Sequence, residues 1–241
     1  SITQRLSTMR ATYRAIGVVL LLAACDSARG DCLLRRLPAD GSWATFHCSE
    51  EFDEGTTRNT YITIKSVGKA AVDGADCRWI ELKYQSDESR ATGNGYVIKF
   101  LIPEEHLGPD GDPLQHVIKT WRKNLDEEPG ELAMEKLVEQ YPRLYLVFSE
   151  PIKITKKREE QGVVEWQRGR LECEVLEGTS RRELKVENCD LEYRLSVSEK
   201  VPFGVAGVTM RLESSLGYKG TIEYRLVDMG TDAISDLPDS K

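Results

Sequence analysis

Alternation of apolar and polar residues in two segments is the feature that most restricts the fold of this chain. From residue 191 to 197, Leu, Tyr, Leu and Val alternate with Glu, Arg and Ser, and from 222 to 226 Ile, Tyr and Leu alternate with Glu and Arg. Successive side chains of a β-strand point to opposite faces, so both segments predict strands with one dry and one wet face. The predicted dry face consists of Leu191, Tyr193, Leu195, Ile222, Tyr224 and Leu226.

Most of the chain between Trp43 and Val227 also has a composition typical of β-strands. Short segments rich in β-branched and aromatic residues are separated by turn pairs such as Asp73-Gly74 and Glu177-Gly178. This pattern predicts an antiparallel sheet. The acidic run from Glu50 to Gly55 is interpreted as a solvated hairpin tip, because its carboxylates lack the spacing of a known calcium loop.

The period changes between residues 112 and 141. Leu114, Val117, Ile118 and Trp121 repeat at intervals of three and four, and Leu132, Met134, Leu137 and Val138 do the same. Such spacing is typical of amphipathic helices. We therefore predict an α+β fold, in which a mostly antiparallel, curved β-sheet carries a two-helix insert at 112–141.

The predicted domain organisation follows from these boundaries. Residues 41–230 form a β-rich globular domain, and residues 231–241 form a mobile tail. A break between Gly130 and Pro151 could instead divide the chain into two smaller domains.

The N-terminal region has the layout of a secretory signal. Basic residues follow Met9, an uncharged stretch runs from Ala15 to Ala24, and Cys25 ends it. About ten apolar residues are too few for a membrane-spanning helix, which needs roughly 20. Leu22-Ala23-Ala24-Cys25 resembles the lipobox of bacterial lipoproteins. The resemblance implies a signal peptide at 1–24, with its true start at Met9, cleavage between Ala24 and Cys25, a lipid on the Cys25 thiol, and a tether at 25–40.

Charge restricts the partners of the exported chain. The 241-residue chain has a formal net charge of −7, and removal of residues 1–24 takes away three arginines and no acid, which gives −10. An acidic surface is repelled by phosphate groups, so nucleic acid is not an expected partner. The membrane, reached through the lipid, is the expected attachment, and whether it is the inner or the outer membrane is left open.

Five cysteines remain after the lipidated one. Cys173 and Cys189 lie on neighbouring predicted strands in a compartment that oxidises thiols, so they are predicted to form a disulfide. Cys32 with Cys48 is the alternative pair. No spacing matches a zinc site or a redox dithiol, so no metal site is predicted.

No catalytic motif is present in the sequence. It contains no G-x-S-x-G elbow, phosphate-binding loop, dinucleotide fingerprint or H-E-x-x-H. His106 and His116 flank an acidic loop, but their spacing matches no known ligand pattern, and a solvated loop is the preferred interpretation. We predict no cofactor and no catalytic residue.

The chain is predicted to be exported, tethered and mostly antiparallel. In this organisation it resembles the half-barrel carriers and receptors of outer-membrane lipoprotein transport. Gly41-Ser42-Trp43 and the run from Val201 to Val205 also resemble segments of uncharacterised exported bacterial proteins. The first likeness implies an apolar ligand held in the curve of the sheet. We therefore expect an envelope lipoprotein that acts as a non-catalytic binding or interaction module. The alternatives are a structural envelope protein and a hydrolase without a recognisable motif.

Two interpretations of the dry face are left open. An apolar ligand could lie against it, or the predicted helices could cover it. The second is the more ordinary arrangement in an α+β domain.

Overall fold

The structure is a computed structural model of the 241-residue chain. It describes residues 33–52, 55, 57–86, 95–108, 111, 113–124, 128–134, 136–137, 152–183, 188–217 and 219–237, with only the backbone of 182–183. The predicted signal peptide at 1–24, the lipidation site Cys25 and residues 26–32 of the predicted tether lie outside the described residues.

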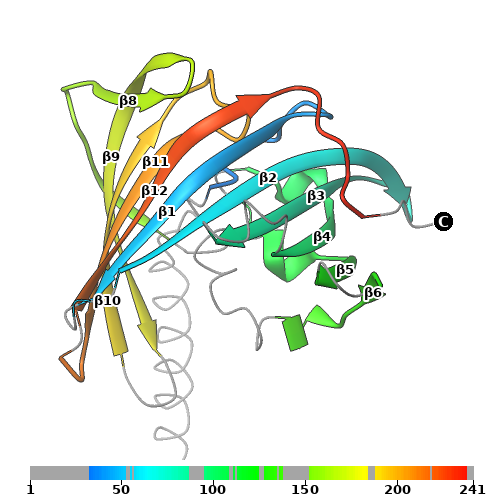
Figure 1. Ribbon diagram of the computed structural model, residues 1–241, viewed down its shortest axis with the longest axis horizontal. Coiled ribbons are helices and arrows are strands. Elements are labelled where there is room, and N and C mark those ends of the chain that lie inside the picture. Colours follow the sequence, from blue (N-terminus) through cyan, green and yellow to red (C-terminus); the bar gives the residue numbers. More distant parts are fainter. Residues whose placement is uncertain are drawn as a thin grey trace, which may run out of the picture.

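Within these residues, twelve antiparallel strands form one sheet, which Figure 1 shows as a curved layer. The first six are β1 (Trp43–Phe52), β2 (Thr57–Val72), β3 (Ala75–Ser86), β4 (Tyr96–Pro103), β5 (Lys119–Asn124) and β6 (Gly130–Glu131). The others are β7 (Lys153–Lys157), β8 (Gly162–Trp166), β9 (Gly169–Glu183), β10 (Asn188–Val197), β11 (Val205–Ser214) and β12 (Lys219–Gly230). Two 3₁₀ turns, η1 (Glu104–His106) and η2 (Pro113–His116), follow β4.

The pairing of β1 with β12 joins the two halves of the sheet. Along the sheet the order is β6-β5-β4-β3-β2-β1-β12-β11-β10-β9-β7, and β8 also pairs with β9. Each half is thus mainly a meander of neighbouring strands. The turn between β2 and β3 contains Asp73 and Gly74, both with positive φ (50° and 85°), as a tight two-residue hairpin requires.

One face of the sheet, here called the inner face, carries the apolar side of each alternating strand. Its central residues in the first half include Phe46 and Leu82, both fully buried. They belong to the same core cluster as Tyr224 and Leu195 of the second half. Apolar residues outside the strands complete this cluster: Leu33, Leu34, Leu107, Leu114, Leu137, Ile152, Val201 and Phe203.

The predicted two-helix insert is wrong. Residues 113–116 form the short turn η2, and 119–124 form β5, whose Trp121 pairs with Lys99 of β4. Ile118, predicted to lie on a buried helix face, is 46% exposed and donates its backbone N–H to Leu101. Pairing with the open edge of β4 satisfies the backbone of this segment and outweighs its local periodicity.

The second predicted helix has little support in the structure. Of its described residues, 134, 136 and 137 are helical, and Leu137 N donates to Ala133 O. No α-helix is among the elements assigned in the described part of the chain. Residues 138–141 lie outside it. Leu137 is nevertheless fully buried in the core cluster. Apolar spacing thus identified a residue that belongs to the buried core.

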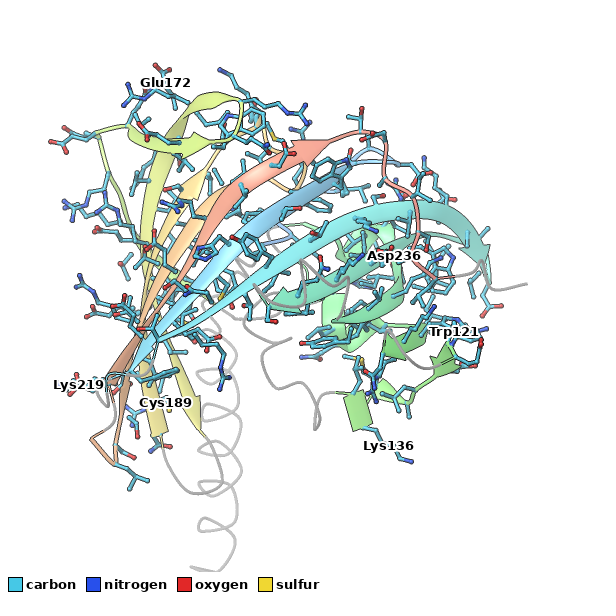
Figure 2. All side chains as sticks on the ribbon, viewed as in Figure 1. Trp121, Lys136, Glu172, Cys189, Lys219 and Asp236 are labelled. Atoms are coloured by element: carbon cyan, nitrogen blue, oxygen red, sulfur yellow. The ribbon has the colours of Figure 1, made fainter. Side chains whose placement is uncertain are left out.

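The C-terminal segment 231–237, the described part of the predicted tail at 231–241, packs on the outer face. Trp43 Nε1 donates to Asp232 Oδ1 at 2.7 Å, and Ser235 Oγ donates to Glu81 Oε2 at 2.6 Å. Asp236 forms an ion pair with Lys65, and Figure 2 marks it over this part of the sheet. The segment therefore covers Glu81, which is fully buried.

The Asp236 contact predicts a pH-dependent stability. Burial raises the pKa of Asp236, but its hydrogen bond with Lys65 and the charges of Lys65 and Lys83 outweigh this and hold the pKa below its ordinary value. A carboxyl whose pKa is lower in the folded state stabilises the protein above its unfolded pKa of about 3.9 and loses this effect as the pH falls through the folded value.

Asp236→Asn should therefore lower the melting temperature at pH 7, and the difference from the wild type should shrink as the pH falls below about 4. Thermal melts between pH 7 and 3 measure this. Asp190→Asn is the matched control, because Asp190 pairs with Arg181 at an exposed site and should change little. A difference for Asp236→Asn that stays constant with pH would contradict the assignment.

Candidate functional site

The six residues of the predicted dry face are all buried. Their exposed fractions are 2% for Leu191, 5% for Tyr193, 0% for Leu195, 6% for Ile222, 4% for Tyr224 and 1% for Leu226. All six belong to the core cluster on the inner face. Most of this face therefore packs against protein, and contact of these six side chains with a ligand stays a prediction.

A pocket of about 360 Å³ opens on the inner face where five strands end. We call it the rim pocket, and its lining includes Cys48 and Glu50 of β1, Thr60 and Ile62 of β2, Tyr84 of β3 and Tyr224 of β12. Arg58 of β2 and Tyr96 of β4 also line this pocket. Tyr224 is the member of the predicted dry face that reaches the pocket.

Strand register explains why these residues meet. Cys48 lies between Tyr224 of β12 and Thr60 of β2. Tyr84 pairs with Tyr96 across β3 and β4. Residues two positions apart on a strand share a face, so Glu50 joins Cys48, and Ile62 joins Thr60. The pocket is thus a direct product of the alternation that predicted the strands.

Larger hollows occur on the outer face. Hollows of about 460 and 550 Å³ are lined by charged side chains of both signs, including Glu192 and Arg211 in both. Such linings suit water, whereas small-molecule sites are mostly apolar with a few polar groups. The rim pocket fits the second description better, because Ile62 and three tyrosines form much of its wall.

The position of Glu50 contradicts the interpretation of the run from Glu50 to Gly55 as a solvated hairpin tip. Its side chain is on the inner face and only 1% of the residue is exposed, whereas Glu51 and Phe52 are exposed. The signal was present in the sequence, because Phe46, Cys48 and Glu50 continue the period of two into the acidic run. A buried carboxylate is costly unless it interacts with polar or charged groups, so its position in a pocket wall makes Glu50 a candidate for contact with a ligand.

The Glu50 carboxylate shares the pocket with a thiol and with tyrosine hydroxyls. Its Oε1 lies 4.0 Å from the Cys48 thiol. Burial raises the pKa of the Tyr224 hydroxyl far above its ordinary value, and the nearby Cys48, Tyr84 and Glu50 raise it further. Tyr224 therefore stays protonated at neutral pH. The rings of Tyr84 and Tyr96 stack with centroids 4.6 Å apart and an angle of 18° between their planes.

The predicted disulfide between Cys173 and Cys189 is wrong. Cys189 of β10 pairs with Arg182 of β9, which is nine positions along the strand from Cys173. At about 3.3 Å per residue the two cysteines are roughly 30 Å apart, whereas a disulfide requires Cα atoms within about 7 Å. Figure 2 labels Cys189 and Glu172, the neighbour of Cys173, at opposite ends of the sheet. Cys173 is a buried free thiol. Cys32, from the alternative pair, lies outside the described residues.

His106 and His116 lie against each other, although a solvated loop was the preferred interpretation of this segment. Their rings stack with centroids 3.4 Å apart, and His106 Nε2 lies 3.6 Å from Glu105. Glu104 instead pairs with the buried Arg78. Within the described part of the chain, no group of three or more His, Cys, Asp or Glu side chains is arranged to hold a metal ion. The same residues include no helix with the length and hydropathy needed to cross a membrane.

Comparison with known proteins found similar structures at low sequence identity. A candidate lipoprotein from Parabacteroides distasonis is 8% identical, with 83% of this chain and 100% of that chain covered and a TM-score of 0.37. A candidate exported protein with a YmcC-like fold from Bacteroides fragilis is 8% identical, with the same coverage and a TM-score of 0.40. A LolA superfamily protein from Nitrosomonas europaea is 12% identical, with 85% and 90% covered and a TM-score of 0.32.

These neighbours are of the kinds that the sequence resembles: lipoproteins, exported proteins and proteins of the lipoprotein-carrier type. No family model and no curated protein matches the chain. Since all three TM-scores are below 0.5, we base no functional conclusion on these likenesses.

Proposed function

We propose that this chain is a bacterial envelope lipoprotein that binds an apolar or amphiphilic ligand in the rim pocket and does not act as an enzyme. The observation that carries the proposal is the pocket itself, a hollow of about 360 Å³ on the apolar face of the sheet. That volume falls within the range of about 300–1,000 Å³ common for small-ligand sites.

The walls of the pocket support an apolar ligand. Ile62, Tyr84 and Tyr224 line the pocket. Each is at most 7% exposed, so the apolar surface that binding would remove from water is mainly that of the ligand itself. A hydrocarbon chain placed against them would gain roughly 25 cal/mol for each Å² of apolar surface removed from water. Thr60, on the same wall, is only half-buried and offers space where an added side chain would compete with a ligand.

Filling the pocket should reduce binding. Thr60→Trp places an indole ring in the pocket and should weaken the binding of N-phenyl-1-naphthylamine, an apolar fluorescent probe, by about tenfold or more. Asn59→Trp is the matched control, because Asn59 is the next residue of β2, exposed on the opposite face. Fluorescence titration of both variants and the wild type makes the comparison. Equal affinity in all three, or no binding to the wild type, would contradict the proposal.

The membrane anchor is the second part of the proposal. It rests on the apolar stretch that ends at Leu22-Ala23-Ala24-Cys25 and on the polar sequence that follows. The lipid would hold the domain at the surface of the inner or outer membrane, while residues 25–40 connect it to β1.

Cys25→Ser should abolish lipid attachment, since only a thiol can form the thioether to diacylglycerol. Expression in bacteria supplied with radioactive palmitate, followed by gel autoradiography, should show a labelled wild type and an unlabelled variant. Cys32→Ser controls for the loss of a cysteine as such and should stay labelled. Label that persists in Cys25→Ser would refute the anchor.

A further inference from the structure

Two opposite charges lie side by side in the rim pocket. Glu50 of β1 is directly opposite Arg58 of β2 in the strand register, and both line the pocket. Glu50 is 1% exposed, whereas Arg58 is exposed. The carboxylate therefore belongs to the wall of the pocket, and the guanidinium group is accessible to solvent at its mouth.

The surroundings of Glu50 favour a cation. Tyr84, Tyr96 and Tyr224 line the same pocket, and Tyr224 remains a neutral phenol at neutral pH. The faces of aromatic rings attract ammonium groups, most strongly where water is excluded, and quaternary ammonium ligands are commonly held in aromatic cages. A carboxylate in a pocket that three tyrosines also line thus suits an organic ammonium group, and it would repel the carboxylate of a free fatty acid.

The accessible Arg58 favours an anion close to that cation. A guanidinium group binds phosphate through paired hydrogen bonds. Directly opposed residues on neighbouring strands have Cβ atoms about 5 Å apart. A phosphate joined to an ammonium group by a two-carbon link carries its charges at a comparable spacing, so one headgroup can reach both side chains.

We propose that the rim pocket binds the headgroup of a zwitterionic phospholipid, with the ammonium group against Glu50 and the tyrosines and the phosphate on Arg58. This inference rests on the proposed function, because the acyl part of the ligand would use the apolar wall formed by Ile62 and its neighbours. It adds the chemical class of the headgroup and the two residues that recognise it.

Calorimetric titration of the purified protein with three probes tests this inference. The probes are dodecylphosphocholine below its micelle concentration, 1-dodecanol as the chain alone, and phosphocholine as the headgroup alone. The wild type should bind dodecylphosphocholine about tenfold or more tightly than either part. Glu50→Gln and Arg58→Gln should each remove most of that preference, measured as the ratio of the affinities for dodecylphosphocholine and 1-dodecanol. Glu51→Gln, on the exposed face of the same strand, is the control for Glu50→Gln and should behave as the wild type.

The outcomes separate this inference from the proposed function. Equal binding of dodecylphosphocholine by the wild type and both pocket variants, with 1-dodecanol still bound, would overturn the headgroup assignment alone. Failure of the wild type to bind 1-dodecanol and dodecylphosphocholine would overturn the proposed function as well. Phosphocholine bound as tightly as dodecylphosphocholine would indicate a small free zwitterion and would overturn the lipid assignment. If Glu50→Gln fails to fold, the exposed Arg58→Gln still decides the result.

Discussion

The dry inner face of the sheet must be kept from water, and most of the fold can be understood from this requirement. Strands from both halves contribute alternate apolar side chains to it, and the pairing of β1 with β12 makes the two halves continuous. Curvature brings these side chains into one cluster, and loop residues such as Phe203 and Leu114 complete it. The hydrophobic effect acting on this one face therefore sets the register of the strands, because a shift by one residue would expose all of it.

The rim pocket is the place where this apolar face contains a charge. Glu50 occupies a position that the strand period assigns to the interior, beside Cys48 and near three tyrosines. Replacement of a buried charge by an apolar residue of similar size is often neutral or stabilising, so stability gives little reason for a carboxylate here. Recognition of a ligand does give one, and this is why the proposed function and its headgroup centre on the same few residues.

Sequence reasoning was most successful where the period of two was clear. It identified the dry faces of β10 and β12, and the turn at Asp73-Gly74, because these features are local. It failed at residues 113–124, where apolar spacing suited a helix but the open edge of β4 offered a strand partner. Pairing between distant segments cannot be read from local spacing, and the same limit explains the wrong disulfide, since β9 is long enough to separate Cys173 from Cys189. The buried position of Glu50 could have been found by continuing the alternation of β1.

Mass spectrometry of the protein purified gently from its bacterial membrane, without exchange into strong detergent, tests the central claim most directly. The account predicts one amphiphile bound per chain, with a zwitterionic headgroup, that remains bound in native spectra and is identified after extraction. A protein that carries no bound lipid under these conditions, and takes up none when mixed with membrane lipids, would contradict it.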